Sequence, residues 1–224
     1  MTNQFFEYYL GKTRENKDCY LDMKKNLLIV DKNKQGQVNL FQNLIGYLLK
    51  NYNCEDAQIV LVDYQDKHYT EYKNNDKLFL LIANNNNEVV DVLEFVKFVQ
   101  NYRVALLKEC NVKNIEEHNK KEKNKLPYLF VFVDEINDFV ENEFWDKLFA
   151  IAKTSRITGI NIIAATSVLD KTKSLCGKIK ATFMDRICFE VDTKEESKLV
   201  IDEYGAENLN NGEIFVNDEI IKLN

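Results

Sequence analysis

The sequence contains few of the residues that form tight turns. Its 224 residues include seven glycines and a single proline. Because glycine and proline mark the frequent turns of sandwiches and barrels, their scarcity argues against such folds and favours long helices between strands. The hydrophobic fraction of 45% is sufficient for a sizeable core, which excludes a disordered or fibrous chain.

An excess of basic charge is also lacking, since the formal net charge is -6. No domain-wide positive field exists to release counterions from DNA or RNA, so a nucleic-acid partner is not favoured. The five cysteines are an odd number without C-x-x-C spacing. Reduced thiols are therefore expected rather than a disulfide framework or a metal site.

Long apolar runs and a signal-like N-terminus are absent as well. A membrane-spanning helix needs about 18 or more mostly apolar residues, so we expect the chain itself neither to span a membrane nor to be exported. The chain could still be one soluble piece of a larger protein that is anchored in a membrane.

Short apolar runs alternate with stretches of helical periodicity. Continuous apolar runs suit strands that are covered on both faces, and helical spacing of apolar residues suits the helices that cover them. The alternation predicts an α/β domain with a mainly parallel sheet flanked by helices. The expected strands are 27–30, 58–63, 78–83, 128–133, 160–166 and 186–191, and the expected helices are 38–50, 88–110 and 139–153.

The two ends of the chain are predicted to add strands to the sheet or to contact another domain. Residues 213–216 and 219–223 flank Asn217 and Asp218, which predicts a C-terminal β-hairpin at the sheet edge. Residues 1–25 contain an aromatic cluster and are predicted to form an edge strand or a segment that docks on a preceding domain.

The stretch 111–126 interleaves lysines with acids, which favours a charged loop over a phosphate-binding patch. His118 in this stretch has no catalytic partners that the sequence identifies.

Two segments lie where ligands gather in parallel sheets, at the carboxyl ends of strands. Residues 31–38 separate an apolar strand from an amphipathic helix, the position of a phosphate-binding loop. The strand 128–133 ends in Asp134 and Glu135, an arrangement similar to a Walker B element, in which the acids hold magnesium and polarise water.

Segments along nearly the whole chain resemble, in order and spacing, FtsK/SpoIIIE-like ATPase domains. The resemblance implies a RecA-like P-loop NTPase fold and a single domain over 1–224. The matching segments are 10–12, 26–30, 59–63, 111–115, 126–128 leading to 134–135, 155–161, 164–166, 185–191, 204–209 and 212–215.

The departures from that family concern the phosphate loop. Glycines of the family are replaced here by Asp31 and Lys34, the phosphate-binding lysine by Gln37, and the magnesium-binding Ser/Thr by Val38, while Gly36 is retained. Non-glycine residues resist the positive φ angles of such loops. Loss of a charged hydrogen bond and of a metal ligand should cost about 1.5–3 kcal/mol each, so we expect weak or absent binding of Mg-ATP.

Other family positions are altered or ambiguous. Ser167 replaces the glutamine of the family's A-T-Q motif. Asp134 is a candidate magnesium ligand and Glu135 a candidate remnant of the catalytic base, but both could instead cap the following helix, and we favour a structural remnant. Arg156 and Arg186 occupy positions that suit inter-subunit or nucleotide contacts, although a surface or strand-end role is the simpler interpretation.

One group in this superfamily carries tandem ATPase domains with eroded loops, the membrane-anchored EssC/EccC coupling proteins of type VII secretion. The chain looks like the C-terminal domain of such a protein, and its abundance of Lys and Asn suits a low-GC Gram-positive bacterium. The resemblance implies recruitment of WXG100-like export substrates, contact with preceding ATPase domains, hexameric assembly and a place on the cytoplasmic side of the cell membrane.

Two alternatives keep the fold but change the function. A DNA-translocating motor of the FtsK or conjugation type would need Lys and Ser/Thr at positions 37 and 38 and a basic surface. A nucleotide-binding switch with a non-standard loop would use Lys32 or Lys34 in place of the missing lysine, with Asp134 helping to place magnesium.

Overall fold

The computed structural model describes residues 5–63, 68–69, 72, 79–83, 85–139, 142–167 and 176–224. Within them the strands are β1 (Glu7–Thr13), β2 (Asp18–Asp22), β3 (Leu27–Val30), β4 (Ala57–Val62), β5 (Phe79–Ala83), β6 (Tyr128–Val133), β7 (Ile160–Thr166), β8 (Asp185–Cys188), β9 (Glu213–Val216) and β10 (Glu219–Leu223). The α-helices are α1 (Gln35–Asn51), α2 (Asn86–Glu109), α3 (Ile115–Lys121), α4 (Asn142–Ala152), α5 (Ser155–Thr158), α6 (Cys176–Thr182) and α7 (Lys194–Ile201), and the short 3-10 helices are η2 (Ile136–Asp138) and η4 (Ala206–Asn208).

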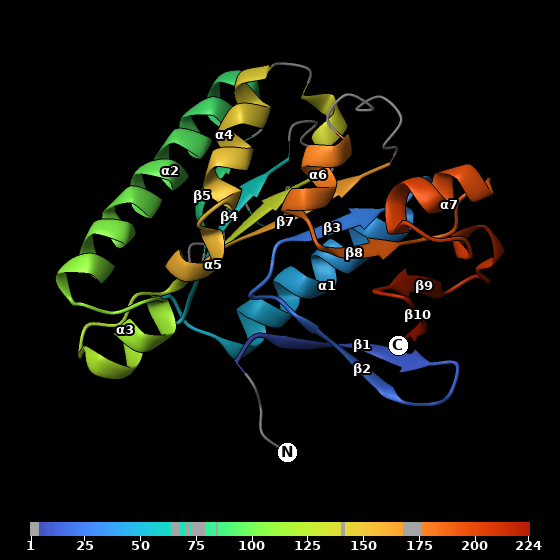
Figure 1. Cartoon of the computed structure of the whole chain (residues 1–224), viewed down its shortest axis with the longest axis horizontal. Helices are drawn as coiled ribbons and strands as arrows, with labels where there is room; N and C mark the ends of the chain where they lie inside the picture. The colour runs from blue at the N-terminus through green and yellow to red at the C-terminus, as the bar shows by residue number, and fades with distance from the viewer. Residues whose placement is uncertain are drawn as a thin grey trace.

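The strands form one mixed sheet in the order β2-β1-β10-β9-β8-β3-β7-β6-β4-β5. The six strands from β8 to β5 are parallel, and the four others join antiparallel at the β8 side. This arrangement confirms the predicted α/β fold, and β3 lies between β8 and β7 in the parallel part. Figure 1 shows the antiparallel strands gathered near the C-terminus, away from α2 and α4.

The two faces of the sheet have different covers. Alternate residues of β3, such as Leu28 and Leu27, belong to two separate apolar cores. Helices α2, α4, α6 and α7 contribute to the core that contains Leu28, whereas α1 contributes Phe41 and its neighbours to the core that contains Leu27. Figure 1 shows α1 on the opposite side of the sheet from α2 and α4. Because both faces are covered, β3 and β6 are continuously apolar, as predicted.

The C-terminal hairpin is confirmed, but its predicted place at the sheet edge is wrong. Asn217 and Asp218 have φ angles of 42° and 72°, which suits a two-residue hairpin turn. Beyond β10 lies β1, whose Gly11 pairs with Leu223, and β2 forms the edge. A Cβ on Gly11 would lie 2.0 Å from a carbonyl oxygen of β10, so only glycine allows this pairing. The N-terminal segment therefore completes the sheet.

The stretch 111–126 is not only a loop, because helix α3 forms within it. Asn114 caps the helix by accepting from the Glu117 N–H, and Ile115 is buried. The Asn119 side chain bonds both backbone groups of Leu126, which fixes the segment after the helix. His118 is 3% exposed, so it belongs to the packing of this segment.

Helix α4 begins later than the predicted residue 139. Residues Ile136–Asp138 form η2 and Phe139 is extended, while the Trp145 indole N–H donates to the Phe139 carbonyl. Residues 140 and 141, and residue 78 of the predicted strand 78–83, lie outside the described residues. None of the described helices combines the length and apolarity that a membrane crossing requires.

Candidate functional site

Polar residues follow four neighbouring parallel strands, at the carboxyl-terminal side of the sheet. Asp31 follows β3, Ser167 follows β7, Asp134 and Glu135 follow β6, and Asp63 follows β4. The ladder continues one residue beyond the strands, since the Asp31 N–H donates to the Thr166 carbonyl and the Asp134 N–H to the Val62 carbonyl. The predicted site residues of the loop and of the β6 end therefore do lie together.

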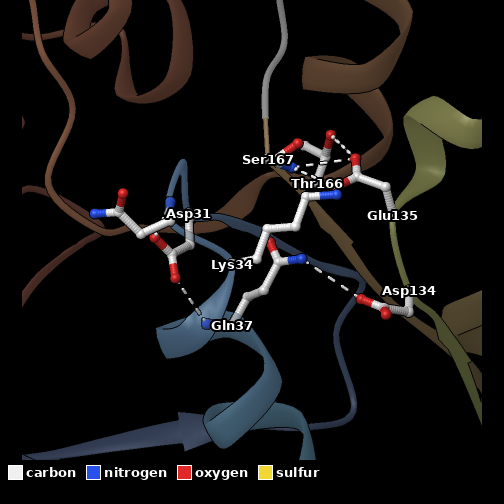
Figure 2. Close-up of polar contacts among 8 residues, drawn as sticks. Asp31, Lys34, Gln37, Asp134, Glu135, Thr166 and Ser167 are labelled. Carbon is white, nitrogen blue, oxygen red and sulfur yellow. Dashed lines mark hydrogen bonds and ion pairs between the residues drawn. The ribbon is translucent and has the colours of Figure 1, made fainter. Parts of the chain in front are cut away.

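In the loop after β3, the Asp31 carboxylate accepts hydrogen bonds from backbone amides of the same loop and of α1. The Asn33 N–H donates to Asp31 Oδ1 at 3.0 Å, and the Gln37 N–H donates to Asp31 Oδ2 at 3.1 Å. Asp31 is 3% exposed, and Figure 2 shows its carboxylate at the start of α1. Amides in this position bind phosphate in P-loop proteins, because the positive end of the helix dipole favours an anion. Here a side chain of the protein supplies that anion.

The expectation that non-glycine residues resist a positive φ is wrong at Lys34. This residue precedes α1 with a φ of 62°, and its N–H donates to the Asp31 carbonyl. Gly36 lies in the first turn of α1 and is required for a different reason. A Cβ there would lie 2.3 Å from the ring of Phe189, so the retained glycine permits close packing.

Lys34 makes an ion pair with Glu135. Its Nζ lies 2.9 Å from Glu135 Oε2, and the Glu135 side chain is 7% exposed. Glu135 also accepts from the Thr166 hydroxyl at 2.9 Å and from the Ser167 N–H at 3.1 Å. Burial alone would raise the pKa of the Glu135 carboxyl, but Lys34 and the Ser167 bonds outweigh it and hold the pKa below its usual value.

These contacts contradict the alternative that Glu135 caps the following helix. Glu135 has a φ of 50° and makes no side-chain hydrogen bond at the start of η2. Its carboxylate points back to the end of β7 and toward Lys34, as Figure 2 shows. The sequence missed this partnership because Lys34 and Glu135 are separated by about 100 residues in the chain.

Asp134 lies in a different environment from its neighbour. It is 7% exposed, and its contact with Gln37 is long, with Nε2 lying 3.5 Å from Oδ1. Burial, followed by the negative charges of Asp63 and Glu135, raises the pKa of the Asp134 carboxyl to about 7. Asp63 is the last residue of the predicted strand 58–63, but the sequence could not place it beside Asp134, because the β4–β6 register is a tertiary property.

The remaining candidate residues lie apart from these contacts. Lys32 pairs with Asp192, and Val38 is half-buried and carries no oxygen that could bind a metal. Arg186 donates to Asp202 at 2.7 Å, which gives it a structural partner near the end of α7. Arg156 is exposed in α5.

A polar hollow of about 490 Å³ beside the loop was not predicted. Several asparagines contribute to it, among them Asn39 and Asn43, whose spacing on the exposed face of α1 was the available signal. Its lining residues are Tyr8, Leu10, Asp31, Asn33, Gln35, Gly36, Asn39, Leu40, Asn43, Phe189, Glu190, Asn210, Asn211, Gly212, Glu213, Leu223 and Asn224.

Comparison with known proteins places this geometry in a family, although no family model matches the chain. The sequence is 30% identical over 215 residues to a DNA translocase FtsK of Chlorobaculum tepidum, covering 89% of this chain and 27% of that protein. A DNA translocase FtsK of Clostridium tetani is 27% identical over 217 residues, covering 92% of this chain and 29% of that protein. This chain is an FtsK/SpoIIIE-like P-loop ATPase domain. It spans somewhat more than a quarter of the length of these relatives.

Solved structures agree with this fold. The domain matches the conjugation coupling protein TcpA of pCW3, in its monomer form with ATPγS, at a TM-score of 0.85 and 21% identity, covering 99% of this chain and 66% of that one. It matches EssC (ATPases 2 and 3) of Geobacillus thermodenitrificans at 0.83 and 17%, covering 100% and 45%. Thermomonospora curvata EccC (ATPases 2 and 3), in complex with a signal sequence peptide, matches at 0.77 and 14%, covering 97% and 40%. The RecA-like ATPase fold is thus established.

Proposed function

We propose that this chain is a single, degenerate ATPase domain of a membrane-anchored type VII secretion coupling protein. It recruits WXG100-like export substrates, regulates neighbouring ATPase domains, and binds Mg-ATP weakly or not at all. The observation that carries the proposal is that the Asp31 carboxylate accepts the Asn33 and Gln37 amides at the start of α1.

A triphosphate does not fit this loop. The amides that would bind it already have an anionic partner, and a phosphate placed there would be repelled by the Asp31 charge. The position of the phosphate-binding lysine holds Gln37, which is 1% exposed and uncharged. The position of the metal-binding hydroxyl holds Val38, so the loop supplies no oxygen for a nucleotide-bound magnesium.

The residue in the place of the catalytic base is also engaged. Glu135 forms an ion pair with Lys34 and accepts from Thr166 and Ser167, so its carboxylate is held toward β7. Hydrolysis would need this carboxylate to polarise a water instead. These contacts support a structural role for Glu135.

The solved structures that share this fold and the net charge both support the proposed cargo role. EssC and EccC structures that contain two ATPase domains match this chain over nearly its full length, and one EccC structure holds a signal sequence peptide. The net charge of -6 does not suit a nucleic-acid track. We propose that neighbouring ATPase domains in the same protein, on the cytoplasmic side of the membrane, are further partners, and that the full-length protein assembles into hexamers.

Nucleotide binding tests the first half of the proposal. Calorimetry with Mg-ATPγS should give no saturable binding by the wild-type chain at micromolar ligand. A restored loop, with Asp31→Gly, Lys34→Gly, Gln37→Lys and Val38→Thr together, should bind at least roughly 10² more tightly. Micromolar binding and steady hydrolysis by the wild type would refute degeneracy.

Substrate binding tests the second half. Immobilised chain should retain a purified WXG100 dimer from a type VII locus and release a helical dimer of similar size and charge from an unrelated system. Equal retention of both dimers, or of neither, would contradict the cargo role whatever the outcome with nucleotide.

A DNA translocase is the second candidate, because the matched sequence relatives are DNA translocases. It predicts binding to duplex DNA that weakens steeply with salt, together with ATP turnover that DNA stimulates. Both signals in the same protein preparation would favour this candidate.

A non-standard nucleotide switch is less well supported. Lys34 is paired with Glu135 and Lys32 with Asp192, so either lysine would have to leave its partner to bind phosphate. If Gln37→Lys with Val38→Thr fails to raise nucleotide affinity, then the closed loop, rather than the missing side chains, prevents binding.

A further inference from the structure

Helix α2 carries a row of exposed aromatic side chains. Phe95, Phe98 and Tyr102 are 36%, 70% and 57% exposed. Ala105, about one turn further along the helix, is exposed as well. The steps between these four positions are three, four and three residues, which places all four on one face of the helix. Single exposed apolar residues are ordinary on a protein surface, but a contiguous row marks an interaction site.

The opposite face of α2 is already occupied within the domain. Val92 and Val96 belong to the core between the helices and the sheet. Gln100 donates to a carbonyl of α4, and Arg103 donates to a carbonyl of α5. Figure 1 shows α2 at the outer edge of the molecule, with α4 beside it. The aromatic row therefore points away from the domain.

The row has the spacing of a coiled-coil seam. In a coiled coil, apolar residues at alternating steps of three and four form the contact between two helices. Asp91 and Glu109 take the next seam positions at the two ends of the row, and both are exposed. Because these two residues are charged, the apolar seam is limited to residues 95–105, a length of roughly 15 Å. The partner that fits such a seam is another helix.

The row is complementary in shape to a second copy of itself that runs antiparallel. In that pairing, centred at residue 100, Phe98 of each copy lies opposite Tyr102 of the other, and Phe95 lies opposite Ala105. Two aromatic rings then meet in each central layer, and a large residue meets a small one in each outer layer. A parallel pairing would instead crowd two Phe95 rings at one end and leave a gap between two Ala105 methyl groups at the other.

The charges beside the seam also favour an antiparallel second copy. Glu94, Asn101 and Lys108 lie along one side of the seam, and all three are exposed. In the antiparallel pair Glu94 of one copy lies near Lys108 of the other, and the two Asn101 side chains meet at the centre. The helix dipoles also oppose each other in this orientation. Asp91 and Glu109 repel across the two ends, which keeps the association weak.

We propose that the Phe95, Phe98, Tyr102 and Ala105 face of α2 binds the same face of a second copy, with the two helices antiparallel. Such an interface uses one patch twice about a two-fold axis. The three aromatic side chains expose roughly 300 Å² per copy, less than the about 800 Å² per partner of a stable complex. The dimer is therefore weak, with a dissociation constant in the micromolar range or above. The inference does not depend on the proposed secretion role.

Sedimentation velocity of the wild-type chain, from low concentration to the millimolar range, tests the pairing. We expect a reversible equilibrium between monomer and dimer. Phe98→Glu should weaken it at least about tenfold, because the substitution places a charge at the centre of the seam. Met184→Glu adds the same charge at another exposed apolar residue, outside α2, and should leave the equilibrium unchanged. Melting temperatures of both variants confirm that each is folded.

Chemical cross-linking tests the orientation. The antiparallel pair brings the two Asn101 positions together and separates the two Asp91 positions by roughly 27 Å along the helices, since each residue rises 1.5 Å. With a short bis-maleimide, Asn101→Cys should therefore give a covalent dimer. Asp91→Cys should give no more than the wild type, whose own five cysteines set the background.

Three results would overturn the proposal. The wild-type chain could stay monomeric at every concentration, a folded Phe98→Glu variant could dimerise like the wild type, or Asp91→Cys could cross-link as readily as Asn101→Cys. If the chain is monomeric and Phe98→Glu instead reduces retention of the WXG100 dimer, the α2 face binds helical cargo and the second copy is excluded. None of these measurements depends on whether ATP binds.

Discussion

The Nζ of Lys34 lies 2.9 Å from the Oε2 of Glu135, and this contact joins the loop after β3 to the end of β6. Lys34 and Glu135 are about 100 residues apart in the chain. Their ion pair is therefore a tertiary connection between two strand ends.

Removing Lys34 alone should destabilise the chain more than removing the charges of both Lys34 and Glu135. Lys34→Ala leaves the buried carboxylate without its cation and should lower the free energy of unfolding by about 1–3 kcal/mol, a range reduced for the partial exposure of Lys34. Lys34→Ala with Glu135→Gln should recover part of the loss, because no buried charge remains. Urea denaturation of both variants measures this, and equal losses would contradict the pairing.

The Asp31 carboxylate should act as the cap of the loop. Asp31→Ala removes the acceptor of the Asn33 and Gln37 amides and should destabilise the chain by about 1–2 kcal/mol. Asp31→Asn keeps one acceptor oxygen and should lose less. A calorimetric melt of the two variants provides the comparison, and an unchanged Asp31→Ala variant would show that the amides have other partners.

Gly36 should not tolerate even one methyl group. Gly36→Ala places a Cβ against the Phe189 ring and should cost about 1–3 kcal/mol through overpacking. Gly46→Ala, in the same helix with nothing within 4 Å of its Cβ position, should instead stabilise by about 0.5–1 kcal/mol. Opposite signs in denaturant midpoints are expected, and the same sign for both would remove the packing argument.

Asp202 should make the region around β8 sensitive to acid. The hydrogen bond from Lys180 and the charge of Arg186 hold the pKa of the Asp202 carboxyl below its usual value. A lowered pKa means that its contribution is present at neutral pH and is lost as pH falls below the ordinary value, near 4. The difference in melting temperature between wild type and Asp202→Asn should therefore shrink between about pH 5 and pH 2. A constant difference would show that these contacts are too exposed to matter.

Local sequence was sufficient to predict elements that depend only on neighbouring residues. The strands at 27–30, 128–133 and 160–166 were predicted with the bounds that the structure has, because a continuous apolar run has few other stable outcomes in an α/β protein. The turn at Asn217 and Asp218 was also predicted from local sequence, because Asn and Asp tolerate the positive φ angles of a two-residue hairpin turn. Helix α3 was missed although its Asn114 cap is local, since the dense charge of that stretch concealed the buried Ile115.

Candidate site residues were identified individually, but their partners were not. The sequence placed Asp31, Lys34 and Glu135 at strand ends, yet it could not show that Asp31 would bind the loop amides or that Lys34 would accept a positive φ. The partner of Lys34 was also out of reach of local sequence, because Glu135 approaches it from another strand.

The sequence by itself determined the fold class, which follows from the alternation of apolar runs and helical periodicity, and it showed Gln37 and Val38 where the family that it resembles has lysine and Ser/Thr. Only the tertiary structure decided which buried groups became neighbours. Asp63 and Asp134 are about 70 residues apart in the chain. They are adjacent in the sheet because β4 and β6 are parallel and in register, which aligns the ends of two strands that are distant in sequence.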